Sequence, residues 1–285
     1  MKDQGHVATL RQWDEWGRAF VPTRTSRPNW SAVDLLIKAA MPRLKKDSSE
    51  LRGLLKRSSG QLLSDPLLID LGVHRWLDKE TSYSDWLAWV IEQLGDPISV
   101  LTVFGLQDTP FASTCTGKVL VQREEELGQG SPGRKGRIDL LICFGEPVSS
   151  VLGVEVKIDD EQHEKQQGYA ASLSSLGLPH KCVLVARDEK ILPGQLRGFL
   201  PRKWWDVGIA LRQAITRYAR SHENHAVQAM MLAFVAAVEQ NILKLGTSAS
   251  RRAWQGKPVL LSRELAKYLR SLGGMLNENQ KSTAK

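Results

Sequence analysis

The feature of this sequence that most constrains its fold is a series of four short β-type runs between residues 118 and 188. The runs are rich in Val, Leu and Ile and are separated by segments containing glycine, proline or serine, which is typical of strands joined by turns. One helical pattern precedes the first run at residues 80–95, and another separates the third and fourth runs at residues 161–176. The runs are residues 118–127, 137–144, 151–158 and 181–188. This order predicts an α/β fold with a mixed central sheet.

The rest of the chain has helical patterns on both sides of this core. Before it, a helical pattern begins at Ser31 and is expected to end at Pro42. We predict an N-terminal helical segment at residues 1–75, a core at 76–200, and C-terminal helices with a short flexible tail at 201–285. The N-terminal segment is either a helical addition to the core or an arm that contacts DNA.

Composition and charge limit the partners and the cellular location that we expect for the protein. The formal net charge is +8 at pH 7, which suits a polyanionic partner but also describes an ordinary basic protein. No apolar run approaches the roughly 20 residues that span a bilayer, and the N-terminus lacks the apolar core of a secretory signal. Cys115, Cys143 and Cys182 are far apart and lack zinc-site spacing. We therefore expect a cytoplasmic protein that does not cross a membrane.

The third run carries two charged residues within an otherwise apolar strand pattern. Because side chains alternate between the faces of a strand, Glu155 and Lys157 share one face of residues 151–158, and the apolar positions share the other. Charged side chains are rarely buried unless they are paired or functional. A same-face ion pair on a half-exposed strand is the structural alternative to a catalytic role.

Asp139 lies near the start of the second run, on the face opposite Ile138 and Leu140. A neighbouring strand could bring its carboxylate beside Glu155. Two carboxylates near a lysine suit Mg²⁺, which prefers oxygen ligands and keeps positions for water and phosphate. The alternative for Asp139 is an ion pair with Arg137 on the same strand face.

The two helical patterns direct polar residues toward the site. Stepping back by four residues along the apolar stripe of the second pattern leads to Gln166 and Gln162, and the same procedure in the first pattern leads to Glu80. Glu80 lies just outside the helix if Ser82 is the N-cap and Asp85 completes a capping box. Otherwise Glu80 is a surface residue, and the glutamines form hydrogen bonds to backbone.

A Gly- and Arg-rich segment, GQGSPGRKGR, follows the first run, and we predict it to be a loop. Its basic residues are Arg134, Lys135 and Arg137. A flexible basic loop beside an active site can follow a phosphate backbone. More often, such a run is only a solubilising turn.

Taken together, the stretches GRIDLLI, VLGVEVK, QQGYA and ETSYSDWLAWV resemble the PD-(D/E)xK nuclease superfamily. The resemblance covers about residues 80–188, and its order of elements is that of the family's restriction-endonuclease-like αβββαβ core. The sequence departs from the family pattern at Ile138, where the family name has proline. Many members lack that proline.

The resemblance implies roles for the strand residues. Asp139 and Glu155 would bind Mg²⁺, which Mn²⁺ could replace, together with the backbone carbonyl of Val156. Lys157 would orient or help to deprotonate the attacking water and would stabilise charge in the transition state.

The resemblance also implies roles for the helix residues. Glu80 would hold a water molecule at the cation or a second cation. Gln166 or Gln162 would position a phosphate or a carboxylate of the strands.

We therefore expect a Mg²⁺-dependent endonuclease that acts on DNA rather than RNA, in a prokaryotic antiviral defence or restriction setting. One alternative is a nucleic-acid-binding or assembly subunit that retains the fold without catalysis. Another is a helical scaffold protein whose terminal segments carry the function. The sequence leaves open whether the chain acts as a homodimer or as a subunit of a larger complex.

Overall fold

The computed structural model describes residues 30–60, 79–130, 134–158, 166–187, 198–245 and 263–282. The chain divides into two compact units, Met1–Leu44 and Lys45–Lys285. Helix α2 (Trp30–Ser58) runs across this division and contains Pro42, so the helix end predicted there is wrong. A proline removes one helical hydrogen bond, and the turns on both sides retain theirs. The boundary predicted between residues 75 and 76 lies outside the described residues.

A five-stranded sheet in the order β1-β2-β3-β4-β5 forms the centre of the second unit. The strands are β1 (Val119–Gly130), β2 (Arg134–Phe144), β3 (Ser150–Val156), β4 (His180–Ala186) and β5 (Phe199–Lys203). β1, β2 and β3 pair antiparallel, whereas β3, β4 and β5 pair parallel. The predicted α/β fold with a mixed sheet is therefore confirmed. β5 was not predicted, because it is short and contains a proline.

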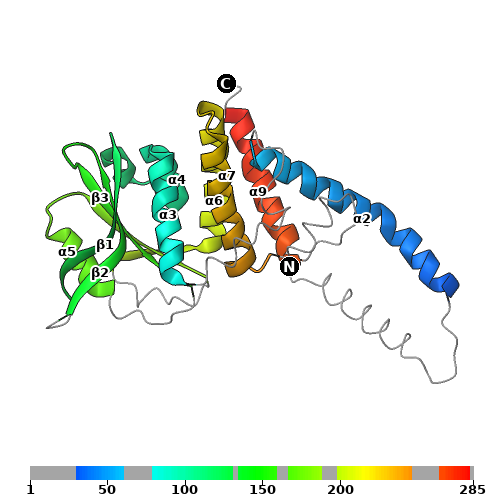
Figure 1. Cartoon of the computed structure of the whole chain (residues 1–285), viewed down its shortest axis with the longest axis horizontal. Coiled ribbons are helices and arrows are strands. Elements are labelled where there is room, and N and C mark those ends of the chain that lie inside the picture. The colour runs from blue at the N-terminus through cyan, green and yellow to red at the C-terminus, as the bar shows by residue number, and fades with distance from the viewer. Residues whose placement is uncertain are drawn as a thin grey trace, which may run out of the picture. The chain divides into compact units, whose positions relative to one another are not determined.

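Helices cover both faces of this sheet (Figure 1). α5 (Gln166–Ser174) packs on one face. The other face is covered by α3 (Glu80–Leu94), α4 (Pro97–Phe104), α6 (Trp204–Ser221) and α7 (His225–Ala237). A short 3₁₀-helix (Pro110–Thr114) precedes β1, and α9 (Arg263–Ser282) packs against α6 and α2. In the described part of the chain, no helix has the length and apolar character needed to cross a bilayer.

Both faces of β3 are buried, which makes it the central strand of two cores. Leu152 and Val154 belong to the core beneath α3, α6 and α7. Val151 belongs to the core beneath α5, together with Tyr169 and Leu173. A charged residue on β3 therefore cannot reach solvent on either face and must find its partners at the end of the strand.

Ile138 departs from the expected alternation of β2. The sequence places it on the same face as Leu140, but it packs in the core beneath α5. Gly153 provides the space, because a Cβ there would lie 2.6 Å from Ile138 Cδ1 and 2.8 Å from Leu173 Cδ1. The change of face comes immediately before Asp139 and therefore shapes the surroundings of a candidate site residue.

The segment predicted as a basic loop is largely a hairpin. β1 continues to Gly130, β2 begins at Arg134, and these two residues pair across the hairpin. The loop prediction is therefore wrong for Arg134 and Lys135, which lie on β2, whereas Arg137 lies on β2 as the predicted run 137–144 has it. The register shifts between Glu126 and Gln129, as in a β-bulge. Glycines and charges in place of apolar alternation concealed these strand ends from sequence prediction.

α3 begins earlier than the capping-box alternative implies. Its first residue is Glu80, and the N-cap Lys79 makes no side-chain capping bond. Asp85 instead forms an ion pair with Arg123 of β1, so the predicted Ser82–Asp85 capping box is wrong. Glu80 thus lies in the first turn, where the helix dipole favours a negative charge.

A buried polar network joins the helices behind the sheet. Arg212 of α6 and Glu239, in a π-helical turn (Val238–Ile242), form an ion pair with no exposed surface. Arg212 Nε and Nη2 donate to the two Glu239 oxygens at 2.6 and 2.8 Å. Arg212 Nη1 also donates to Ser58 Oγ, and the Tyr268 hydroxyl donates to Glu239 Oε1 at 2.6 Å. The network therefore fixes α2 and α9 to the core.

The Glu239→Gln substitution should strongly destabilise the protein, because it leaves the Arg212 charge buried without its counter-charge. We expect the free energy of unfolding to fall by about 3–5 kcal/mol, measured by urea denaturation. The exposed Glu223→Gln variant is the control and should change it by less than about 0.5 kcal/mol. Equal effects of the two substitutions would contradict a structural role for the network.

Candidate functional site

The two candidate carboxylates come from adjacent strands. In the antiparallel β2–β3 pair, the regular pairing ends at Leu140 and Val154, and Asp139 and Glu155 are the next residues of the two strands. The two carboxylates lie close enough for the Asp139 charge to raise the pKa of Glu155. The adjacent strand ends therefore bring Asp139 and Glu155 together.

The Asp139 side chain accepts a hydrogen bond in place of the backbone bond that would follow the last regular β2–β3 pair. Its Oδ2 accepts a hydrogen bond from the amide N of Val156 at 2.7 Å, whereas the regular β2–β3 pairing ends at Leu140 and Val154. A charged acceptor on a backbone N–H makes a strong and directional bond. The Asp139 carboxylate is therefore held between the two strand ends.

Lys157 follows β3 directly, and both its backbone and its side chain are held. Its N–H donates to the Val185 carbonyl at 2.8 Å, and its own carbonyl accepts from Trp204 Nε1 at 3.1 Å. Its Nζ lies 2.8 Å from Glu80 Oε1 and 3.1 Å from Glu155 Oε1. The ammonium therefore bridges a carboxylate of α3 and a carboxylate of β3.

Glu80 uses both of its oxygens at this position. While Oε1 accepts from Lys157 Nζ, Oε2 accepts from the amide N of Ile158 at 3.2 Å. The start of α3 is thereby joined to the segment that follows β3, across 77 positions of sequence. This geometry makes Glu80 a residue that orients Lys157. A direct contact of Glu80 with a cation stays a prediction.

The burial of Glu155 governs the electrostatics of the site, since its side chain is only 8% exposed. Burial raises the pKa of Glu155, the Asp139 charge raises it further, and Lys157 lowers it, so that the pKa is about 7. Burial lowers the pKa of Lys157, but the Glu155 and Glu80 carboxylates outweigh this effect and raise it above its ordinary value. Lys157 is therefore a cation at neutral pH, whereas Glu155 is divided between its charged and neutral forms.

One oxygen of the Glu155 carboxylate is suited to bind an additional cation. Glu155 Oε2 is buried and has no hydrogen-bond partner in the described part of the protein. A buried carboxylate oxygen without a partner is unfavourable, and a divalent cation would remove that cost. The described residues contain no group of three or more His, Cys, Asp or Glu side chains arranged to hold a metal. Mg²⁺ is commonly bound by one or two carboxylates with water and substrate phosphate, which fits Asp139 and Glu155.

The other predicted site residues are only partly described. Gln162 lies outside the described residues. Gln166 is the first residue of α5, but the structure describes only its backbone. The side chains of Arg134 and Lys135 are likewise not described, whereas Arg137 is exposed on β2. Their contacts with substrate, like a contact of the Val156 carbonyl with a cation, stay predictions.

Two aromatic residues, one near the carboxylates and one at the Lys157 backbone, were not predicted as part of the site. Tyr169 of α5 is buried, and burial together with the charges of Glu155 and Asp139 raises the pKa of its phenol. Trp204 is fully buried and fixes the Lys157 carbonyl. Tyr169 lies on the apolar stripe of its helix, and this periodicity could have identified it from the sequence. No local pattern connects Trp204 with Lys157.

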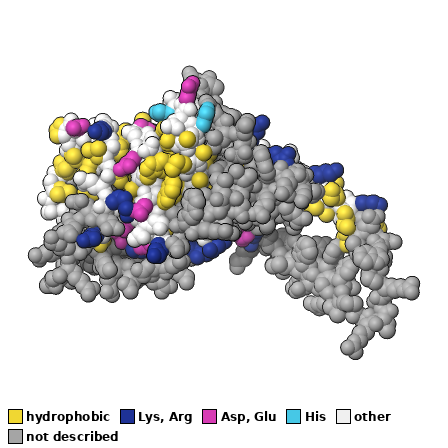
Figure 2. Space-filling model, viewed as in Figure 1, with side chains coloured by type: hydrophobic (Ala, Val, Ile, Leu, Met, Phe, Trp, Pro, Cys, Tyr) yellow, Lys and Arg dark blue, Asp and Glu magenta, His cyan; other side chains and the backbone are white. Residues whose placement is uncertain are grey.

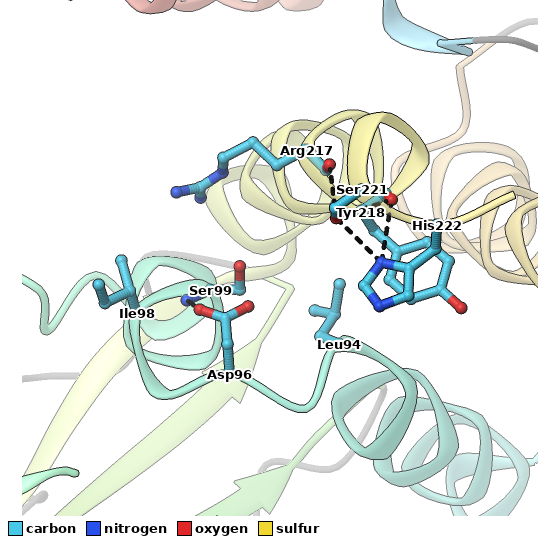
Figure 3. Close-up of a pocket in the computed structure, with 8 residues that line it drawn as sticks. All are labelled: Leu94, Asp96, Ile98, Ser99, Arg217, Tyr218, Ser221 and His222. Carbon is cyan, nitrogen blue, oxygen red and sulfur yellow. Dashed lines mark hydrogen bonds between the residues drawn. The ribbon is translucent and has the colours of Figure 1, made fainter. Parts of the chain in front are cut away.

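A cavity of about 250 Å³ lies at the opposite end of α3 (Figure 3). Its lining residues are Leu94, Asp96, Ile98, Ser99, Arg217, Tyr218, Ser221 and His222. Asp96 caps α4 by accepting from the Ser99 amide N, and Arg217 Nε is buried without a partner in the described part of the protein. Leu94 ends the helix that Glu80 begins. At about 1.5 Å per residue, some 20 Å of α3 separate the cavity from the carboxylate site.

Comparison with known proteins gave no match to a protein-family model, to a curated protein or to a solved structure.

The raised pKa of Glu155 predicts a pH-dependent stability in the presence of EDTA. The pKa is about 7 in the folded protein, against 4.5 for an unperturbed glutamate. The stabilisation from neutral Glu155 is complete below the unfolded pKa and is lost as the pH rises through 7. Between about pH 5 and pH 8, the free energy of unfolding should fall by on the order of 2–3 kcal/mol more in the wild type than in Glu155→Gln.

Urea denaturation across this pH range measures the difference. The Glu92→Gln variant, at an exposed position of α3, is the matched control and should keep the wild-type pH dependence. Parallel stability curves for the wild type and Glu155→Gln would show that Glu155 has no raised pKa.

Proposed function

We propose that this protein is a Mg²⁺-dependent nuclease with a restriction-endonuclease-like core. The observation that carries the proposal is the buried Glu155 carboxylate, with one oxygen free of hydrogen bonds in the described part of the chain, near the Asp139 charge and beside the Lys157 ammonium. Apart from α4 and the 3₁₀-helix, which lie between α3 and β1, the element order α3, β1, β2, β3, α5, β4 is the core order that the sequence resemblance implies, and this supports the proposal.

Each charged side chain of the site has a distinct role in the proposed reaction. Asp139 and Glu155 hold the cation, and Asp139 is oriented by the Val156 amide. When bound, Mg²⁺ supplies a Lewis acid at the phosphate and makes water more acidic. Lys157 places a permanent positive charge beside the carboxylates, where it orients the attacking water and stabilises charge that develops on phosphate. Glu80 positions Lys157.

Nucleic acid is the substrate class that best fits the chain. The formal net charge of +8 favours a polyanion, and release of phosphate counterions by basic side chains drives such binding. The sequence resemblance favours DNA over RNA, endonucleolytic cleavage, a cytoplasmic location and a role in prokaryotic antiviral defence. Mn²⁺ should replace Mg²⁺.

One observation favours a second candidate function. The Lys157 ammonium already lies within 3.1 Å of two carboxylates, as in a purely structural ion-pair network. A nucleic-acid-binding or assembly subunit that retains the fold without catalysis would show the same ion pairs. Such a protein would gain nothing from the unpartnered Glu155 oxygen, and for this reason we favour the nuclease.

Cleavage assays on plasmid, linear and single-stranded DNA and on RNA test the proposal. With Mg²⁺ or Mn²⁺, we expect cleavage by the wild type and none with EDTA. Asp139→Ala and Lys157→Ala should each lower the rate by at least about a hundredfold, the scale typical of removing a single electrostatic group from an active site. The rate should fall because the first variant lacks a cation ligand and the second lacks the charge at the phosphate.

Asp85→Asn is the matched control, because Asp85 is an exposed carboxylate on α3, the helix that also carries Glu80. This variant should cleave at nearly the wild-type rate. Cleavage that survives both Asp139→Ala and Lys157→Ala would falsify the site. Binding of nucleic acid without any cleavage would instead identify the non-catalytic subunit.

A further inference from the structure

The part of α2 within the second unit, Lys45–Ser58, has two distinct sides. Leu51, Leu54 and Leu55 are buried in the core formed with α9. The exposed basic residues of the same segment are Lys45, Lys46, Arg52, Lys56 and Arg57. Figure 2 shows dark-blue side chains along the upper edge of α2. The leucines therefore fix the helix to the protein while the basic side chains remain accessible.

The basic residues form two rows along the helix. At 100° per residue, Lys45, Arg52 and Lys56 fall within about 40° of one another, and Lys46 and Arg57 fall within about 20° of each other. We call the two rows and the strip between them the basic face. It lies on the side of α2 away from the buried leucines.

Ser49 and Gly53 occupy the strip between the two rows. A glycine within a helix costs about 0.5–1 kcal/mol relative to alanine. No close packing accounts for it here, because a Cβ at Gly53 would have no heavy atom within 4 Å. Small residues between two rows of cations leave the helix surface open to a chain of phosphates. Of the acidic residues of this segment, Asp47 falls on the side of the buried leucines, whereas the exposed Glu50 falls within about 40° of Lys46 and Arg57, at the edge of the basic face.

We infer that the basic face binds the phosphate backbone of a nucleic acid, apart from the catalytic carboxylates. The inference rests on the proposed function only in its choice of nucleic acid as the polyanion. An anionic membrane is the other polyanionic surface, but a helix at a membrane interface needs an accessible apolar side. In the Lys45–Ser58 part of α2 that side is occupied, because Leu51, Leu54 and Leu55 are buried.

The test measures binding of a fluorescein-labelled DNA duplex of about two helical turns to the full-length protein in EDTA, so that no cleavage is needed. Fluorescence anisotropy is recorded from about 50 to 200 mM KCl. The test variant carries Lys45→Gln, Lys46→Gln and Lys56→Gln. The matched control carries Lys118→Gln, Lys181→Gln and Arg220→Gln, at exposed positions elsewhere. Both lower the formal net charge of +8 by the same amount.

We expect the test variant to bind at least about tenfold more weakly at low salt. Its slope of log K against log salt should fall by roughly 2–3, at about 0.9 for each phosphate that the protein no longer neutralises. The control should stay close to the wild type. Gly53→Gln should weaken binding without lowering the melting temperature, because it fills the strip between the rows.

Three outcomes would overturn the inference. These are an equal weakening of binding in the test and control variants, wild-type affinity in the test variant, and binding to phosphatidylserine vesicles without salt-dependent binding to DNA. Absence of cleavage in the nuclease assay would leave this test unaffected, because the binding measurement uses no divalent cation. The two proposals therefore fail separately.

Discussion

The constraint on which the rest of the site depends is the burial of the Glu155 carboxylate with too few hydrogen-bond partners. Glu155 lies on a strand whose two faces are both buried, and one of its oxygens has no hydrogen bond in the described part of the protein. Burial of an uncompensated charge costs several kcal/mol. Lys157 offsets only part of this cost, since the pKa of Glu155 is still raised to about 7. We propose that a bound cation offsets the rest of this cost.

Several elements hold this arrangement in place. The first turn of α3 supplies Glu80, which fixes the Lys157 ammonium, while β4 and Trp204 fix the Lys157 backbone. Asp139 ends the regular β2–β3 pairing by accepting from the Val156 amide. The charged groups thus occupy the end of the sheet, between the helices of its two faces, and their orientation comes from backbone groups as much as from side chains.

The parts of this structure that depend on local periodicity could be predicted from the sequence. The alternation around Glu155 and Asp139 predicted both their strands and their shared face, because one period-2 pattern determines both. Ile138 was mispredicted because Gly153 acts across strands, and the hairpin at Arg134 was missed because glycines and charges replace apolar alternation there. The bond from Lys157 to Glu80 joins residues 77 positions apart, so only the folded chain reveals what Glu80 does.

The most direct test of the central claim is an anomalous diffraction measurement on crystals soaked in Mn²⁺. The account predicts a peak about 2.0–2.6 Å from carboxylate oxygens of both Asp139 and Glu155, the range of oxygen ligands around such ions. The peak should be absent in Glu155→Gln crystals. Saturating Mn²⁺ with no density between these two carboxylates, or a cation bound only elsewhere, would contradict the account.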